Sequence, residues 1–112
     1  MGKINSKKKG GRGEREFASF LKEEFGIEAR RGIQFQGSPD SPDVVTDLKQ
    51  LHFEDKRTET FSAYKALEQA KSDSGAKIPV VAHRRNRNEW ILVIFAKDLK
   101  NFSRAILDDI SK

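Results

Sequence analysis

Apolar residues recur along this chain at two spacings, one typical of helices and one typical of strands. In residues 14–25, Phe17, Ala18 and Leu21 recur every three or four positions, as in an amphipathic helix, and Gly26 is a suitable stop. Where apolar residues alternate or form short runs, strands are expected. The predicted helices are 14–25, 60–74 with Thr60 as its cap, and 97–110, and the predicted strands are 27–35, 43–46, 51–57, 78–83 and 90–95.

The order of these elements predicts an α/β fold in which a mixed β-sheet is flanked by helices. Residues 90–95 form an unbroken apolar run, so we expect this strand to be covered on both faces. Two polar segments, 36–42 and 84–88, are expected to be loops, and the second of them is basic. In the last helix, the residues expected to face inward are Leu99, Phe102, Ile106 and Ile110.

The composition suits a small domain without a membrane-embedded part. The chain has 112 residues, of which 36% are hydrophobic, so one modest core is expected. No stretch approaches the ~20 apolar residues of a membrane span, and no apolar leader is visible, so we expect a cytoplasmic protein with no membrane partner. The absence of cysteine excludes disulfides and thiol-ligated zinc, and the two histidines argue against a His-rich metal site.

The net charge of +5 is concentrated at the start of the chain. Residues 1–12 hold five of the 22 basic residues and no acid, so the remaining 17 basic and 17 acidic residues cancel. We expect residues 1–13 to be a flexible basic arm attached to a single domain at 14–112. Such an arm suits a polyanion such as DNA, although a solubilising tail has the same composition. Its basic residues are Lys3, Lys7, Lys8, Lys9 and Arg12.

Glu14 is an acid on the apolar side of the first predicted helix. At about 100° per residue it lies on the stripe formed by Phe17 and Leu21, whereas Glu16 is expected to point toward solvent. An acid in the first turn gains ~0.5 kcal/mol from the helix dipole, but this does not explain its inward position. Because burying a carboxylate is costly, a functional role is favoured for Glu14.

The strand 51–57 places chemically active side chains on one face. Side chains alternate along a strand, so His52, Glu54 and Lys56 share a face opposite to that of Leu51, Phe53, Asp55 and Arg57. Asp43 begins the preceding strand, and a hairpin would bring it beside the end of its neighbour. The alternative is a simple ion pair between Glu54 and Lys56 on an exposed strand.

Carboxylates gathered in this way require a cation. Two of them at ~4 Å repel by about 4 kcal/mol at an effective dielectric of ~20, and one lysine does not cancel three acids. A divalent cation does, and an all-oxygen site selects Mg²⁺ or Mn²⁺. Such an ion polarises a phosphoryl oxygen, and a nearby lysine can orient water or stabilise developing charge.

These residues resemble the PD-(D/E)XK nuclease superfamily, and within it the small Holliday-junction resolvases of archaeal and phage type. The resemblance implies a restriction-endonuclease-like core and a homodimeric, metal-dependent endonuclease acting on four-way DNA junctions in prokaryotic or phage-infected cells. It also implies that Glu14, Asp43 and Glu54 bind the metal ion and that Lys56 is the catalytic lysine. The similar segments are 9–10, 13–17, 29–32, 42–45, 53–56 and 79–82, together with the strand that contains Trp90.

Asp55 departs from this resemblance, because the middle position of the E-x-K triplet is usually apolar in the family. Three explanations stay open: an ion pair with Arg57 on the same face, an exposed strand end, or a substitution. Two rival functions are also open. One is a restriction-type or repair nuclease of the same superfamily that acts on other DNA structures, and the other is a non-catalytic DNA-binding module, which Asp55 favours.

Further polar residues are candidates for contact with DNA or for an accessory role in the site. Each has an ordinary alternative as a solvated surface or turn residue. The two histidines, Trp90 and Phe95 are expected to be structural. The candidate DNA contacts are Lys7, Lys8, Lys9, Arg12, Arg30, Arg31, Ser38, Arg57, Arg84, Arg85 and Arg87, and the accessory candidate is Gln69.

Overall fold

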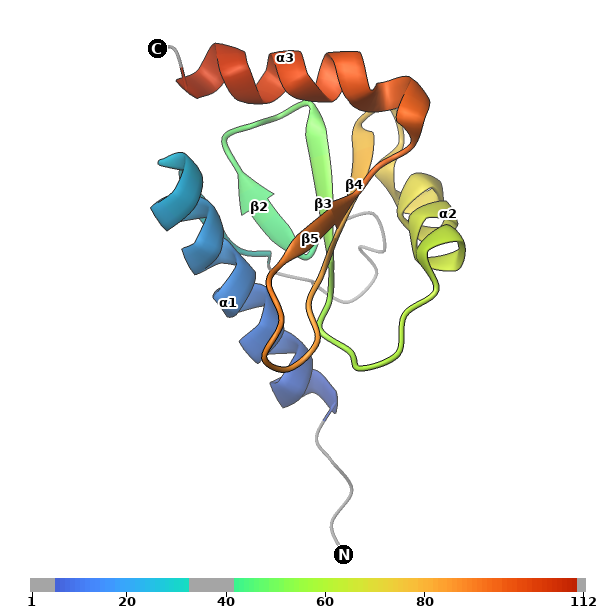
Figure 1. The fold of residues 1–112 in the computed structure, drawn as a ribbon. Helices are drawn as coiled ribbons and strands as arrows, with labels where there is room; N and C mark the ends of the chain where they lie inside the picture. Colours follow the sequence, from blue (N-terminus) through green and yellow to red (C-terminus); the bar gives the residue numbers. More distant parts are fainter. Residues whose placement is uncertain (1–5, 33–41, 111–112) are drawn as a thin grey trace, which may run out of the picture.

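The computed structural model describes residues 6–32 and 42–110 and contains a five-stranded sheet with helices around it (Figure 1). The predicted order of elements is confirmed. The elements are α1 (Ser6–Phe25), β1 (Ala29–Arg31), β2 (Val44–Thr46), β3 (Leu51–Lys56), α2 (Ala63–Ser74), β4 (Ile78–His83), β5 (Ile91–Val93), the 3₁₀ turn η1 (Ala96–Asp98) and α3 (Leu99–Ile110).

The sheet is mixed, as the sequence predicts. Its strands lie in the order β1-β2-β3-β4-β5, and β3 and β4 are the parallel pair, with Leu51 opposite Ile78 and Lys56 opposite His83. The other neighbours are antiparallel. Parallel strands need a crossover, which α2 provides. The ends of β3 and β4 therefore lie side by side, at the same edge as the β4–β5 hairpin.

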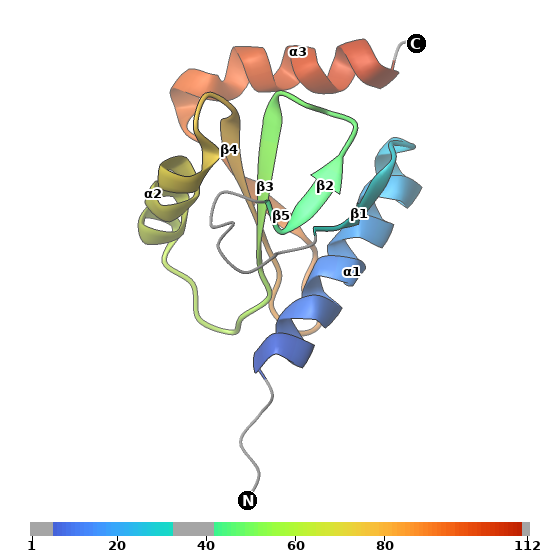
Figure 2. The same cartoon turned by 180° about the vertical axis from the view of Figure 1, so that it is seen from behind.

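Helices α1 and α2 cover opposite faces of the sheet (Figure 2). On one face, Phe17 and Leu21 of α1 are fully buried in the cluster that contains Phe53. On the other, Leu67 of α2 packs in a smaller cluster with Val81 of β4. The predicted apolar stripe of α1 is therefore confirmed. The face of the sheet to which a strand side chain points decides whether it packs against α1 or α2.

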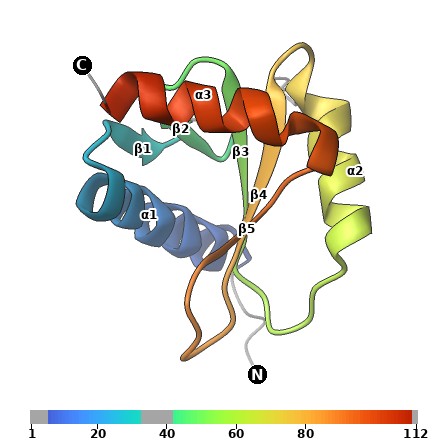
Figure 3. The same cartoon turned by 45° about the horizontal axis from the view of Figure 1, so that its top comes forward.

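Helix α3 lies across the end of the sheet opposite to the β4–β5 hairpin (Figure 3). Ala105 is buried there, and Phe102 and Ile106 pack against the main core. Leu99, predicted to face inward, is instead 56% exposed. This residue begins the helix immediately after η1, where no described element covers it. The side chain of Ile110 lies outside the described set.

Several predicted boundaries were wrong. Strand β5 spans only Ile91–Val93 and lies at the edge of the sheet, with Ile91 50% exposed, so it is not covered on both faces. Helix α2 is preceded by Ser62 as its N-cap rather than by Thr60, whose carbonyl accepts a hydrogen bond from Thr58 Oγ1. Predicted strand residues 33–35 and most of the loop 36–42 lie outside the described residues.

Helix α1 begins at Ser6 rather than at residue 14, so residues 6–13 of the expected arm are helical. Close packing requires a glycine at position 13 of this helix. A Cβ atom there would lie 2.7 Å from both Arg57 Cβ and Asp55 Oδ2. The helix thus approaches the end of β3 closely, and the packing of Phe17 and Leu21 stabilises it beyond what its local propensity supplies.

No helix in the described part of the chain is both long enough and apolar enough to cross a membrane.

Candidate active site

Asp43 is fixed by three hydrogen bonds to the backbone, two of them to β3 and one to Gly32, which follows β1. Its own N–H donates to the carbonyl of Phe53 at 3.0 Å, and its carbonyl accepts from the N–H of Gly32 at 2.7 Å. Its side-chain Oδ2 accepts from the N–H of Asp55 at 2.9 Å. The antiparallel pairing of Val44 with Phe53 orients these groups. The hairpin therefore brings Asp43 next to β3, as its position at the start of a strand predicts.

The carboxyl groups of Asp43 and Glu54 form a hydrogen-bonded pair. Burial, this hydrogen bond and the charge of Glu54 raise the pKa of Asp43 to about 8. For Glu54, burial raises the pKa, but hydrogen bonds from His52 and Asp43 outweigh it, so the net shift is downward. A protonated Asp43 therefore donates to an ionised Glu54 at neutral pH. The two acids behave as one coupled unit rather than as independent groups.

His52 is the second partner of Glu54. Its Nε2 lies 2.8 Å from Glu54 Oε1, and the residue is only 1% exposed. His52 is predicted from the sequence to be structural, although the alternation of side chains along β3 places it on the face of Glu54. A buried imidazole in this position orients the carboxylate and favours its ionised form.

Lys56 completes this face of β3. Alternation along β3 places it on the face of Glu54, where its positive charge helps to lower the pKa of that acid. Lys56 pairs in register with His83 of β4 and is half-buried. The end of β3 thus combines two acids, an imidazole and an amine, and these are the groups needed to hold a cation and stabilise a developing negative charge.

Glu14 approaches this cluster without joining it. Its side chain is 14% exposed, which agrees with its predicted inward position, and its Oε1 accepts from Arg31 Nε at 2.7 Å. Its negative charge contributes to the raised pKa values of Asp43 and Asp55. Within residues 6–32 and 42–110, no three Asp, Glu or His side chains are placed to hold a metal ion together. The role of Glu14 as a third metal ligand stays a prediction.

The pair of Asp43 and Glu54 nevertheless fits a divalent cation. Both groups supply hard oxygen donors, and burial makes a second negative charge costly in the absence of a positive one. A cation bound between them would replace the proton that they now share. Arg31 engages Oε1 of Glu14, and Glu14 would have to move toward the pair to contribute a third oxygen.

Asp55 lies on the opposite face of β3, against Gly13 of α1. Its Oδ1 is buried and has no hydrogen-bond partner within residues 6–32 and 42–110. Burial together with the charges of Glu14 and Glu16 raises its pKa to about 7. Of the explanations left open, the ion pair with Arg57 is not formed, because that guanidinium donates to Glu16 instead. Nor is the strand end fully exposed.

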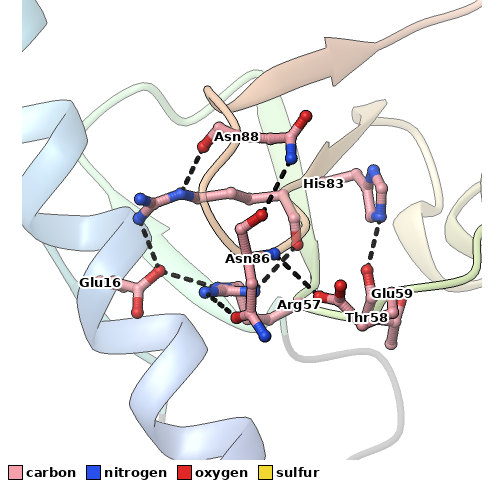
Figure 4. Close-up of polar contacts among 8 residues, drawn as sticks. Glu16, Arg57, Thr58, Glu59, His83, Asn86 and Asn88 are labelled. Carbon is pink, nitrogen blue, oxygen red and sulfur yellow. Dashed lines mark hydrogen bonds and ion pairs between the residues drawn. The ribbon is translucent and has the colours of Figure 1, made fainter.

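Glu16 does not point into solvent as predicted. Its Oε1 accepts from Arg57 Nε at 2.9 Å and from Arg84 Nη1 at 3.0 Å (Figure 4). The physical reason is that the end of β3 and the β4–β5 hairpin both lie beside α1. Helical periodicity gives the direction of a side chain but not the segments that meet it.

The other predicted contact residues that the structure describes belong to several different elements. Arg12, Arg30, Arg85 and Arg87 are exposed, and Lys7, Lys8 and Lys9 belong to the first turns of α1. Gln69 is exposed on α2. Ser38 lies outside the described residues.

Comparison with solved structures finds a similar fold, whereas comparison of the sequence finds no match. No family model and no curated protein matches this chain. The solved structure of Hjc from Archaeoglobus fulgidus, a Holliday junction resolvase from an archaeal hyperthermophile, has a TM-score of 0.55 and 25% sequence identity. The match covers 77% of this chain and 72% of that one. The chain thus has a nuclease-like α/β fold similar to the core of that resolvase.

Proposed function

We propose that this protein is a metal-dependent endonuclease of the PD-(D/E)XK type that hydrolyses phosphodiester bonds in branched DNA. The observation that carries the proposal is the partly buried pair of Asp43 and Glu54, next to Lys56, on a fold similar to that of a Holliday junction resolvase. A pair of acids this costly to ionise is typical of a catalytic site.

Each residue of the candidate site has a separate role in the proposed hydrolysis. Asp43 and Glu54 would hold Mg²⁺ or Mn²⁺, with Glu14 as a third ligand. The cation supplies positive charge that stabilises the phosphoryl group as it is attacked. Lys56 orients the attacking water and stabilises the negative charge that develops, while His52 keeps Glu54 ionised and correctly oriented.

The partner that we propose is a four-way or otherwise branched DNA. A homodimer with one site per subunit would place two sites to cut two strands, and its place of action would be the cytoplasm of a prokaryotic or phage-infected cell. Basic residues near the start of α1 and on the hairpin after β4 supply the phosphate contacts.

A nicking assay tests the proposal. The protein is incubated with a synthetic four-way junction, a linear duplex of the same sequence and a single strand, in Mg²⁺, Mn²⁺ or EDTA. Selective nicking of the junction that EDTA abolishes is the expected result. Equal cutting of the duplex would instead indicate a restriction-type or repair nuclease, and tight binding without cutting in either metal would indicate a DNA-binding module.

Matched variants locate the site. Asp43→Asn is expected to lower cleavage at least about 100-fold while retaining or improving DNA affinity, because it removes a ligand and a negative charge. Asp47→Asn, an exposed acid after β2, is the control. Lys56→Gln is expected to lose cleavage as well, with exposed Lys49→Gln as its control. Cleavage by Asp43→Asn at the wild-type rate would show that the site lies elsewhere.

A further inference from the structure

The β4–β5 hairpin is fastened to the body of the protein by Glu16. One oxygen of this carboxylate accepts from Arg57, which follows β3, and from Arg84, which begins the hairpin, at 2.9 and 3.0 Å (Figure 4). The side chain of Glu16 is 31% exposed, as is that of Arg84, and that of Arg57 is 18% exposed. Three segments distant in sequence are therefore joined at one carboxylate.

The same guanidinium groups also fix the hairpin backbone. Arg57 donates through Nη1 to the carbonyl of Arg84 at 3.2 Å and through Nη2 to Asn86 Oδ1 at 2.9 Å. Arg84 Nε donates to the carbonyl of Asn88 at 2.7 Å, and the N–H of Asn86 donates to Glu59 Oε2 at 2.8 Å. Arg57 and Arg84 thus act as structural braces of the hairpin.

The two remaining arginines of the hairpin, Arg85 and Arg87, are left at its tip. Both are exposed, and among the described residues neither side chain forms a hydrogen bond or an ion pair. Arg87 has φ of 65°, a conformation that costs a side-chain-bearing residue roughly 1–2 kcal/mol. The contacts of Arg57 and Arg84 hold the turn in this costly shape. Such local strain persists only where surrounding contacts impose it.

We propose that Arg85 and Arg87 form a preorganised contact for the phosphate backbone of nucleic acid, and that Glu16 is the residue that positions them. The proposal deepens the proposed function and rests on its choice of partner. Guanidinium groups match phosphate oxygens bidentately, and a rigid turn loses less entropy when it binds. The tip also lies at the end of the molecule where α1 begins, with its run of lysines (Figure 1).

The local charges select a polyanion over a single small anion. Glu59 and Glu89 line a cavity of about 300 Å³ together with Arg85. Glu59 is engaged by the N–H of Asn86, whereas Glu89 is exposed on the hairpin and offsets part of the positive charge. A ligand with one phosphate would gain little here. A backbone with regularly spaced phosphates can contact Arg85, Arg87 and the start of α1 together.

A binding experiment in EDTA tests the contact without interference from cleavage. Affinity for a duplex and a four-way junction is measured as salt increases, for wild type and for the double variant Arg85→Ala/Arg87→Ala. The expected result is about a tenfold loss of affinity and a salt slope smaller by about 2, one for each phosphate contact. The control Lys49→Ala/Lys77→Ala removes the same charge from exposed positions at the opposite end of the sheet. Equal slopes in the two double variants would overturn the contact.

A double-mutant cycle tests the role of Glu16. Simple electrostatics predicts that Glu16→Gln tightens binding of a polyanion, whatever the hairpin does. The positioning role predicts instead that the tenfold effect of Arg85→Ala/Arg87→Ala shrinks to less than about threefold in the Glu16→Gln background. Glu24→Gln, an exposed acid of the same helix, should leave the tenfold effect intact. An undiminished effect in the Glu16→Gln background would overturn the role.

The variant Asn86→Ala gives the same answer if Glu16→Gln does not fold. Asn86 is exposed, and its substitution removes the acceptor of Arg57 Nη2 without changing any charge. The effect of Arg85→Ala/Arg87→Ala on affinity should therefore again fall below about threefold.

Failure of the two proposals is distinguishable. Binding with the expected slope but no cleavage in Mg²⁺ overturns the nuclease alone. Cleavage with no effect of Arg85→Ala/Arg87→Ala overturns the hairpin contact alone. Binding of polyglutamate but not of DNA shows an acidic protein to be the partner.

Discussion

The side chain of Asp43, immediately before β2, donates a hydrogen bond to Glu54 of β3, so that the two acids hold one proton between them at neutral pH. This arrangement follows from the cost of placing two negative charges in a partly buried site. A proton relieves that cost now, and a divalent cation would relieve it more effectively. The proton and the cation therefore compete for the same place.

Mg²⁺ binding should release a proton near neutral pH. Because the pKa of Asp43 is about 8, that group is protonated at pH 7 and must lose its proton to bind a cation. Calorimetric titrations in two buffers of different ionisation enthalpy should show about one proton released per cation at pH 7 and almost none at pH 9.5. Affinity should rise with pH through about 8. Asp43→Asn should abolish the release, and a wild-type titration at pH 7 without it would contradict the shared proton.

Asp55→Asn should stabilise the metal-free protein most at high pH. The folded-state pKa of Asp55 is about 7, above its ordinary 3.8, so its contribution to stability is present at low pH and is lost as pH rises through 7. Asparagine is neutral throughout. The melting temperature of the variant should exceed that of the wild type by about 5 °C at pH 8.5, and by less at pH 5. Exposed Asp47→Asn should show no such trend, and a constant difference for Asp55→Asn would rule out ionisation as its cause.

His52→Phe should weaken cation binding without unfolding the protein. Its Nε2 is bonded to Glu54 Oε1, and the loss of a group that orients a ligand typically costs 10–100-fold in affinity. Calorimetry with Mn²⁺ measures the effect. His83→Phe is the control, because this second buried histidine stacks on Phe61 and contacts the carbonyl of Thr58 instead. Equal losses in the two variants would assign His52 to stability alone.

Gly13→Ala should destabilise the fold although alanine favours helices. The added Cβ would lie 2.7 Å from Arg57 Cβ and from Asp55 Oδ2, so α1 and the end of β3 must separate. Overpacking of this kind typically costs about 1–3 kcal/mol, which chemical denaturation can measure. Ser19→Ala on the exposed side of α1 reports the effect of helix propensity alone and should be neutral or stabilising. A Gly13→Ala variant as stable as Ser19→Ala would mean that the close approach is not maintained.

The local pattern of residues determined the order of elements and the faces of the main ones. The spacing of Phe17 and Leu21 placed the inward side of α1, and alternation along β3 placed His52, Glu54 and Lys56 together. These properties depend on a few neighbouring positions, because a helix and a strand each repeat a fixed geometry. The approach of Asp43 to β3 was also predictable, since a hairpin pairs adjacent strands.

Only the tertiary structure decided which partners these side chains meet. The glycines and lysines of residues 6–13 gave no local signal for a helix, yet α1 begins at Ser6 and lies against the end of β3 at Gly13. Glu14 meets Arg31, and Glu16 meets Arg57 and Arg84, through contacts between segments far apart in sequence. The raised pKa of Asp43 likewise depends on burial among several segments. Burial and ion pairing are properties of three-dimensional neighbours, and periodicity in one segment does not contain them.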